Sequence, residues 1–473
     1  MGLLSAASAI AAGTLLAATS GKPSTSAATD GLLDTWLRQQ SPAFDNWDIG
    51  GQLRIRYEAK DNAGPYPSSD FIASGQVTSN DYFTERLRLH AGYAPSPWLK
   101  AYVEGRYSFS EQDVRVPSPD SDRADLHQAY IEIGDLEQFP LVVKLGRQEL
   151  AYGDQHFVGN GDWSNVARSF DAAKIRYDNG YLWIDAFAGR VVVPYDNHFN
   201  QSNDYDNFSG LYGSTSKLLP WQETQLYFLA RNVQSKAPNA TAPGVPGSPT
   251  TARDIYTIGT RWASLPDKPG GWDYSLEAAL QFGSIVQSNV RHDQQAYAVF
   301  ASGGYTFKDT CWTPRLGLGY DFGSGDSNSK DGKSQTFENL FGTIHRYYGA
   351  MDLFCERNMR VPRLSASIKP TKQLTLSTEY LLFWLANTND SLYPESGSGR
   401  KGNGYGIHPG FNSLVGSEID LVATYSVNPA CELQLGYGHF FTGDYIRQSV
   451  GSVAANGGTT DANWFYLQTR VNF

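Results

Sequence analysis

The stretch Gln52-Leu-Arg-Ile-Arg-Tyr-Glu58 decides the fold, because its apolar and polar side chains alternate with a period of two. Leu53 and Ile55 belong to the apolar set, and Arg54 and Arg56 belong to the polar set. Successive side chains of a β-strand point to opposite faces. The pattern therefore predicts a strand with one apolar face and one charged face.

The same period recurs along the rest of the chain. It is found in Arg86-Leu-Arg-Leu-His90, Lys100-Ala-Tyr-Val-Glu-Gly-Arg106, Gln225-Leu-Tyr-Phe-Leu-Ala-Arg231, Arg363-Leu-Ser-Ala-Ser-Ile-Lys369 and Glu432-Leu-Gln-Leu-Gly436. The alternating segments are about 10–14 residues long, which exceeds most soluble strands and suits a tilted bilayer crossing. A β-sandwich also alternates, but each apolar face then needs a partner sheet. We predict an all-β fold, a transmembrane antiparallel β-barrel.

Eighteen strands are predicted, an even number that brings both termini to one side. They are placed near residues 47–60, 81–94, 97–110, 124–134, 139–151, 168–178, 181–191, 205–217, 222–234, 253–264, 271–286, 292–308, 311–322, 360–370, 372–386, 415–428, 430–443 and 461–473. Apart from a brief connection between 286 and 292, short periplasmic turns alternate with long extracellular loops, as in outer-membrane barrels. Residues 347–354 are interpreted as part of the longest outer loop, 323–359, and as folded into the pore mouth. That loop is the candidate gate of the channel.

The composition excludes several other classes of protein. The 473 residues carry 38 basic and 48 acidic side chains, a net charge of −10, which disfavours a nucleic-acid binder. Aromatic residues reach 13%, which disfavours a disordered chain. Three cysteines cannot form a disulfide scaffold, and no disulfide, metal site or cofactor is predicted.

The N-terminus has the composition of a secretory signal. Residues 3–18 are small and apolar, although no Lys or Arg precedes them, and an ordinary buried helix is the alternative. We expect residues 1–28 to be a signal peptide, 29–46 a periplasmic segment and 47–473 the barrel. Within the periplasmic segment, Leu33 and Trp36 share one face of a short amphipathic helix predicted over 30–38.

Several motifs carry a family resemblance. The first block comprises Lys144-Leu-Gly-Arg-Gln-Glu-Leu150, Tyr152-Gly-Asp154, Trp163-Ser-Asn-Val166 and Arg168-Ser-Phe-Asp171, and the second includes Phe337-Glu-Asn-Leu-Phe341. The chain resembles the alginate-export family of outer-membrane barrels over roughly residues 47–473. The resemblance implies an eighteen-stranded barrel that passes an anionic polysaccharide outward, assisted by periplasmic and inner-membrane partners.

If Leu53 and its equivalents face lipid, the opposite set of side chains lines the pore. The basic members are Arg54, Arg56, Arg86, Arg88, Lys100, Arg106, Lys144, Lys174, Arg176, Arg231, Arg261, Arg315, Arg363, Lys369 and Arg470. The acidic members are Glu58, Glu104, Glu132, Asp185, Glu277, Asp321, Glu379, Glu418, Asp420 and Glu432. Basic walls would concentrate carboxylate-bearing solutes, whose geometry the arginine fork matches. The alternative is that these charges only pair across strands, which requires acidic loop residues to fold inward.

Two further residues complete the predicted substrate-binding lining. Arg147 is out of phase with Lys144 and Gln148, so either a bulge beside Gly146 turns it inward or the predicted register is wrong. Gln148, with Glu149, Asp154 and Asp171, is expected near an outer constriction.

Three functions remain open at this point. The first is an outer-membrane channel that passes an alginate-like anionic polysaccharide out of the cell, as a single barrel in the outer-membrane lipid. The second is a passive uptake porin for small anions. The third is a polysaccharide-processing enzyme that uses a carboxylate pair such as Glu418 and Asp420, but we expect no catalysis, because same-face acids on a strand usually serve as lumen charge.

Overall fold

A computed structural model describes residues 31–63, 70–73, 78–234, 252–266, 268, 270–287, 289–345 and 347–473. The predicted signal peptide, residues 1–28, lies outside the described residues. Among the helices that are described, none has the length and apolar character needed to cross a membrane.

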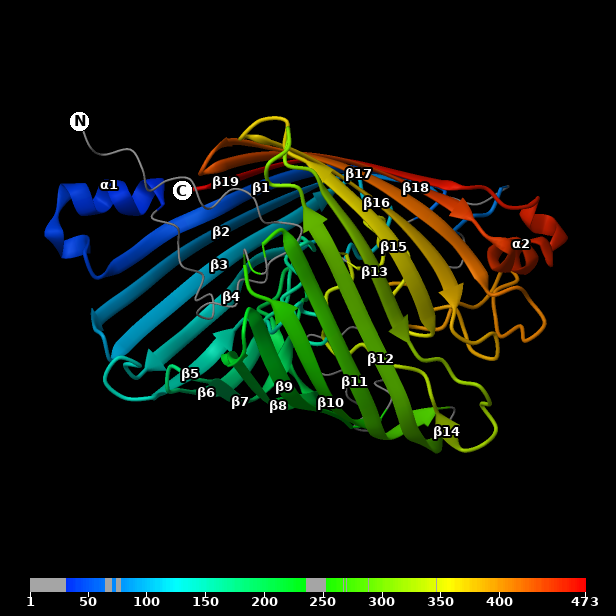
Figure 1. Cartoon of the computed structure of the whole chain (residues 1–473), viewed down its shortest axis with the longest axis horizontal. Helices are drawn as coiled ribbons and strands as arrows, with labels where there is room; N and C mark the ends of the chain where they lie inside the picture. Colours follow the sequence, from blue (N-terminus) through cyan, green and yellow to red (C-terminus); the bar gives the residue numbers. More distant parts are fainter. Residues whose placement is uncertain are drawn as a thin grey trace.

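Within the described part of the chain, eighteen strands form one closed wall (Figure 1). Neighbouring wall strands are antiparallel, and β1 pairs with both β2 and β19, which closes the sheet into a barrel. The predicted fold is confirmed. The wall strands are β1 (Trp47–Asp61), β2 (Asn80–Ser96), β3 (Leu99–Glu111), β4 (Asp122–Ile133), β5 (Leu141–Gln148), β6 (Phe170–Asp178), β7 (Trp183–Val193), β8 (Gln201–Leu219), β9 (Gln222–Val233), β10 (Arg253–Ser264), β11 (Trp272–Gln287), β12 (Val290–Thr306), β13 (Arg315–Gly323), β15 (Met359–Ile368), β16 (Leu374–Leu385), β17 (Leu414–Asn428), β18 (Cys431–Thr442) and β19 (Ala462–Asn472).

The first described residues and the C-terminus lie at the end of the barrel that carries the short turns. Gly51 and Phe473 exchange two backbone hydrogen bonds, of 2.8 and 2.9 Å. Helix α1 (Leu32–Gln40) confirms the predicted N-terminal helix and lies beside the start of β1, where Arg38 donates to the carbonyl oxygen of Trp47 at 3.1 Å (Figure 1). This end is the periplasmic end in the topology of outer-membrane barrels.

The alternation of β1 separates two surroundings, as the sequence predicted. Leu53 and Ile55 are 37% and 42% exposed on the outside of the barrel, whereas Arg54 and Arg56 are 3% and 2% exposed on the inside. The same apolar exposure recurs around the wall. It includes Leu89, Val103, Ile175, Leu226, Ile258, Leu280, Leu318, Leu364, Leu421 and Leu467. An outward apolar belt of this kind is what a lipid-embedded barrel presents to hydrocarbon.

Two elements depart from the predicted arrangement. The two-residue strand β14 (Lys333–Ser334) pairs in parallel with β12 and lies within the longest outer loop. The outer connection 443–461 contains helix α2 (Asp444–Gly451), which buries Tyr445, Ile446 and Val450. Because α2 is only two turns long and sits in a glycine-rich polar stretch, its periodicity is too short to distinguish from a loop.

Candidate functional site: two loops in the lumen

The first loop in the lumen connects β5 to β6 and comprises residues 149–169 (loop A). Strands β5 and β6 have only 8 and 9 residues, against 19 in β8, so the chain leaves the wall part of the way along the barrel. Asp154 in loop A pairs with Arg261 of β10 at 2.7 Å, while Asp162 pairs with Arg86 of β2 at 3.0 Å. Loop A therefore crosses the lumen between two distant parts of the wall.

The wall opposite loop A carries arginines that stand directly beside one another. The register pairs Arg54 with Arg86 on β1 and β2, and Arg88 with Arg106 on β2 and β3. Like charges directly opposite each other destabilise a sheet unless something compensates them. Loop A supplies that compensation.

Backbone carbonyl groups of loop A accept hydrogen bonds from these arginines. Arg54 donates to the carbonyl oxygens of Asp162 and Ser164 at 2.7 and 3.0 Å, and Arg86 donates to the first of these at 3.1 Å. Arg56 donates to the carbonyl oxygen of Trp163 at 2.9 Å, and its guanidinium lies 4.0 Å from the centroid of that ring. The guanidinium groups thus fix the position of loop A by binding the backbone carbonyl groups of the loop.

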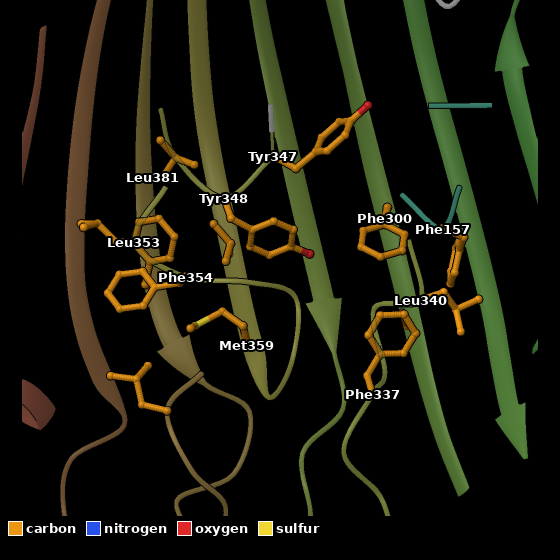
Figure 2. Close-up of a cluster of buried hydrophobic side chains, with 14 of the residues drawn as sticks. Phe157, Phe300, Phe337, Leu340, Tyr347, Tyr348, Leu353, Phe354, Met359 and Leu381 are labelled. Carbon is orange, nitrogen blue, oxygen red and sulfur yellow. The ribbon is translucent and has the colours of Figure 1, made fainter. Parts of the chain in front are cut away.

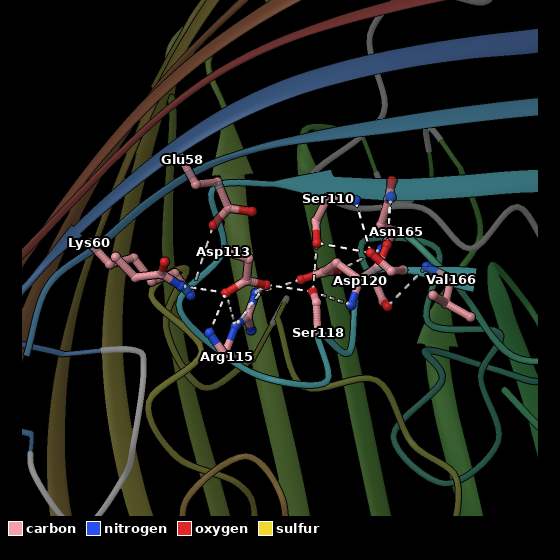
Figure 3. A network of polar contacts seen from close by, with 12 residues as sticks. Glu58, Lys60, Ser110, Asp113, Arg115, Ser118, Asp120, Asn165 and Val166 are labelled. Atoms are coloured by element: carbon pink, nitrogen blue, oxygen red, sulfur yellow. Dashed lines mark hydrogen bonds and ion pairs between the residues drawn. The ribbon is translucent and has the colours of Figure 1, made fainter. Parts of the chain in front are cut away.

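A neighbouring outer loop, residues 112–121, supports loop A from the outer side (Figure 3). The side-chain amide of Asn165 donates to the carbonyl oxygen of Asp120 at 2.9 Å, and its backbone N–H donates to the Asp120 carboxylate at 3.2 Å. Arg115 in turn bridges Asp113 and Asp120, each at 2.8 Å. Asn165 also reaches the wall by donating to the carbonyl oxygen of Glu85 at 3.0 Å.

Carboxylates of loop A add charge compensation to the arginine row. Asp162 lies 3.0 Å from Arg86 and 3.1 Å from Arg88, and Glu149 lies 3.5 Å from Arg88. Burial raises the pKa of the Asp162 carboxyl, but Arg86, Arg88 and Arg54 outweigh it and hold that pKa well below its usual range. Burial also raises the pKa of Glu149, and His127 with Arg88 lowers it to about 2. Both carboxylates are therefore ionised at neutral pH.

The second loop in the lumen connects β13 to β15 and comprises residues 324–358 (loop B). Its buried side chains form a hydrophobic cluster with the inner wall and with loop A (Figure 2). Phe337 of loop B lies 5.7 Å from Phe157 of loop A and 6.4 Å from Phe300 of β12, measured between ring centroids. Tyr348 and Phe354 are completely buried. The interpretation of 347–354 as loop rather than strand is confirmed.

Loops A and B are also joined through their main chains. Val158 and Phe341 form a parallel bridge, flanked by hydrogen bonds from Phe341 to Phe157 at 3.0 Å and from Gly159 to Phe341 at 2.9 Å. Arg168 donates to the carbonyl oxygens of Phe341 and Gly159 at 2.5 and 2.9 Å. The two loops therefore form one assembly that spans the lumen.

Acidic and basic side chains attach loop B to the wall. Glu338 lies 2.5 Å from Arg253 and 3.5 Å from Arg231. On the other side, Glu418 and Asp420 of β17 accept hydrogen bonds from the backbone N–H groups of Met351 and Ala350 at 3.0 and 3.1 Å. These two carboxylates are buried against loop B, so they anchor the loop.

A glycine allows loop B to approach that carboxylate pair. Gly349 has a φ of +84°, and a Cβ atom there would lie 2.3 Å from a carboxylate oxygen of Glu418. A larger residue would be strained by its backbone angle and would also push loop B off β17. The close approach thus depends on this position being glycine.

Other members of the predicted lining lie away from the arginine row that contacts loop A. Lys100, Lys144, Lys174 and Arg176 line the same wall nearer the periplasmic end, and Gln148 ends β5 on the inner face. Arg231 lies beside Glu338 of loop B, and Arg315 begins β13 at the periplasmic end, 2.6 Å from Asp273.

Of the two alternatives for Arg147, the bulge beside Gly146 is not present. Strand β5 pairs with β4 and β6 without a register shift, so Arg147 stays in phase with the outward-facing Leu145. Its guanidinium lies 2.8 Å from Asp171 directly across on β6 and also donates to the carbonyl oxygen of Asn200 at 3.0 Å. Arg147 thus lies at the outer ends of β5 and β6, where the loop between β7 and β8 covers it.

Several contacts were not identified from the sequence. Asp162, Trp163 and Ser164 make most of the bonds between loop A and the arginine row. The one available signal was the motif Trp163-Ser-Asn-Val166, an aromatic and two polar residues between two strands. No periodicity marks it, because its partners are more than 70 residues away on β1 and β2.

A buried carboxyl group in loop B makes stability depend on pH. Glu356 is completely buried, and this burial, together with the negative charge of Asp321, raises its pKa to about 8. Between about pH 4.5 and 8 the folded protein holds a proton that the unfolded chain releases, so this group lowers stability as pH rises. We expect Glu356→Gln to raise the thermal unfolding midpoint at pH 9 and to leave it unchanged at pH 4.5. Equal shifts at both pH values would contradict this assignment.

Comparison with known proteins agrees with this architecture. The alginate export family matches residues 45–459 of the chain. Among curated proteins, no match is found. The fold is similar to the crystal structure of Pseudomonas aeruginosa OccK2 (OpdF), with 12% identity, a TM-score of 0.58, and 91% and 98% of the two chains covered.

Two similar structures were solved with ligands. One is P. aeruginosa OccK2 in complex with glucuronate, with 12% identity, a TM-score of 0.56, and 91% of this chain and 99% of that chain covered. The other is P. aeruginosa OpdK with vanillate, with 11% identity, a TM-score of 0.53, and 90% and 98% covered. These likenesses concern the fold. With its closed eighteen-stranded barrel and a family match over nearly its whole length, the chain belongs to the alginate export family and is an outer-membrane channel protein.

Proposed function

We propose that the channel passes an anionic, alginate-like polysaccharide out of the cell along an arginine-rich and lysine-rich lumen wall. One observation carries this proposal: nine basic side chains of β1, β2, β3, β5 and β6 face the lumen from one side of the wall. They are Arg54, Arg56, Arg86, Arg88, Lys100, Arg106, Lys144, Lys174 and Arg176. A basic surface inside a low-dielectric wall concentrates carboxylate-bearing solutes and repels cations.

The lysines of this wall form a transverse row on the periplasmic side of loop A. The register places Lys100 opposite Glu132, Glu132 opposite Lys144, and Lys144 opposite Lys174. Neighbouring strands are about 4.8 Å apart, so the row presents three ammonium groups and one carboxylate over a short distance. Among the residues that the structure describes, Lys100 and Lys144 form no ion pair. Lys100 is half-buried, whereas Lys144 is only 8% exposed and its ammonium lies 3.5 Å from the centroid of the Tyr130 ring. Of the two, Lys100 is therefore the more open to a carboxylate arriving from the periplasm.

Ion pairing alone does not account for the wall. Arg56 pairs with Glu58 at 2.8 Å, and Arg176 pairs with Asp185 at 2.6 Å, as the alternative interpretation requires. Arg54, however, contacts only carbonyl and amide oxygens among the described groups. Within the described residues, Arg54 thus has no carboxylate in direct contact with its guanidinium group.

Passive uptake of small anions is the second candidate. It is favoured by the likeness in fold to channels crystallised with glucuronate and with vanillate, two small carboxylates. The two functions differ in the ligand that the lysine row must bind, a polymer in the first and a single small anion in the second. A polymer engages several basic groups at once, so its residence should increase with chain length, whereas the binding of a small anion does not.

The remaining assignments concern the ends of the chain and its partners. We propose that residues 1–28 are removed as a signal peptide and that 29–46 stay in the periplasm, where α1 packs beside β1. The channel works as a single barrel in outer-membrane lipid, and periplasmic secretion partners deliver the polymer to the lysine row.

Block of ion current by uronate oligomers tests the proposed function. In planar bilayers we expect oligouronates to interrupt the current for times that lengthen with oligomer length, while neutral oligosaccharides of equal length do not. Changing Lys100, Lys144 and Lys174 to Gln should shorten these blocks several-fold and lower the preference for anions, because three positive charges are lost.

A matched control removes the same charge elsewhere. Lys217, Lys330 and Lys372 are exposed outside the lysine row, so their combined change to Gln should leave the blocks unchanged. Cation preference in the unmodified channel, or equal block by neutral and charged oligomers, would contradict the proposal. Accumulation of polymer in the periplasm of cells that lack the channel would support export over uptake.

A further inference from the structure

The carboxylate of Asp162 occupies the centre of the arginine row. Its Oδ1 atom lies 3.0 Å from Arg86 and 3.1 Å from Arg88, and its backbone carbonyl oxygen accepts from Arg54. The side chain of Asp162 is 42% exposed, whereas that of Arg86 is completely buried. The carboxylate thus lies between buried guanidinium groups and the open lumen.

This carboxylate is not needed to hold loop A. Four hydrogen bonds to main-chain carbonyl groups already fix this part of the loop: Arg54 to Asp162 and Ser164, Arg86 to Asp162, and Arg56 to Trp163. These bonds do not involve the Asp162 side chain. Its interaction with the arginines can therefore be given up without releasing the loop.

Among the acids that reach Arg88, Asp162 is the one most open to exchange. Glu104 and Glu149 also approach this guanidinium, at 3.9 and 3.5 Å, but their side chains are only 7% and 22% exposed. Glu149 is further held by His127 at 2.8 Å and by Asn160 at 2.8 Å. The hydrogen bonds and ion pairs of the Asp162 carboxylate go only to Arg86 and Arg88 among the described residues.

We propose that Asp162 is a tethered counter-ion, whose carboxylate occupies the position that successive carboxylates of the passing polyanion take in turn. The inference rests on the proposed function and adds how the arginine row beside loop A releases the polyanion that it has bound. When a uronate carboxylate replaces that of Asp162, the arginines exchange one charge-assisted contact for another and are never left buried without a counter-charge. When the uronate moves on, Asp162 returns.

This exchange answers a requirement of any conducting site. Binding must be favourable enough for the solute to enter and weak enough for it to leave. A row of unneutralised guanidinium groups would hold a polyanion tightly, because each charge-assisted contact is strong. Competition from a carboxylate fixed in place weakens every such contact by the same amount, wherever along the polymer it occurs.

Neutralising Asp162 tests this role. In Asp162→Asn the dwell time of an oligouronate in the channel should lengthen by about tenfold, since a competing charge-assisted bond has been removed. Asp162→Glu keeps the charge and should behave like the unmodified protein. Heat-modifiable migration in gels checks that both variants retain the closed barrel.

The matched control removes an acid elsewhere in the same lumen. Glu432 of β18 is 21% exposed and pairs with one arginine, Arg470, at 3.0 Å. Glu432→Gln raises the lumen charge by the same amount but should change the dwell time by less than about twofold, because no arginine row surrounds it. Equal lengthening in both variants would overturn the inference in favour of net lumen charge.

The outcomes separate this inference from the proposed function. If oligouronates block the unmodified channel but Asp162→Asn leaves or shortens the dwell time, the tethered counter-ion is overturned and the proposed function stands. If oligouronates block none of the proteins, the proposed function fails and the inference fails with it. Longer blocks in Asp162→Asn alone support both.

Discussion

Replacing residues 325–357 with a short glycine-serine turn is expected to raise the single-channel conductance several-fold. Loop B occupies the lumen with side chains as large as Phe337 and Tyr348, both of which are completely buried. Removing it widens the water-filled cross-section through which ions pass. The wall should survive, because Gly323 lies directly opposite Met359 and a short turn can join them.

Planar-bilayer recordings measure this effect, and the same loop offers a matched control. Residues 328–331 form its exposed tip, so deleting them shortens loop B without removing any buried side chain. We expect the tip deletion to leave the conductance unchanged. An unaltered conductance in the full replacement would mean that loop B does not obstruct the pathway, and its predicted role as a gate would be lost.

The wall of the barrel could be predicted from the sequence because its signal is local. Each strand must separate lipid from lumen at every second residue, so Arg54 and Ile55 reveal their faces within a few neighbours. The boundaries agree with the structure to within a few residues for most strands. Loops A and B, which occupy the lumen, do not show this two-residue alternation.

The loops could not be predicted in the same way, because their partners are distant in sequence. Val158 meets Phe341, and Arg168 holds both loops together, yet no spacing in the sequence connects these residues. A polar loop that is buried by tertiary contacts looks like a polar loop in solvent. The row of arginines indicated that acidic loop residues must fold inward beside them. It did not indicate which acid does so, and Asp162 was therefore not identified.

The error at Arg147 has a related cause. A basic residue in the apolar phase of a strand suggested a bulge, since charge on the lipid face is costly. The structure instead covers Arg147 with the carbonyl oxygen of Asn200 and the carboxylate of Asp171, above the ends of two short strands. Arg147 lies beyond the apolar belt because β5 and β6 are short. Strand boundaries are the feature that a sequence pattern predicts least reliably.

Changing Ile55 to Arg is expected to destabilise the folded barrel by about 2–4 kcal/mol, the cost of placing a guanidinium in the bilayer centre. Ile55 lies in the middle of β1 on the outer face, with 42% of its surface exposed. The neighbouring Arg54 is buried on the inner face and pays no such cost. A shift of one position along the strand therefore decides whether a guanidinium carries this cost.

Unfolding by urea in phospholipid vesicles measures this difference. Ile407→Arg is the matched control, because Ile407 is 50% exposed in an outer loop, where the change should cost less than about 0.5 kcal/mol. Two isoleucines of similar exposure then differ only in whether hydrocarbon or water surrounds them. If both variants lose the same stability, or if the folded chain stays monomeric without detergent, lipid does not solvate the outer face and the channel architecture is wrong.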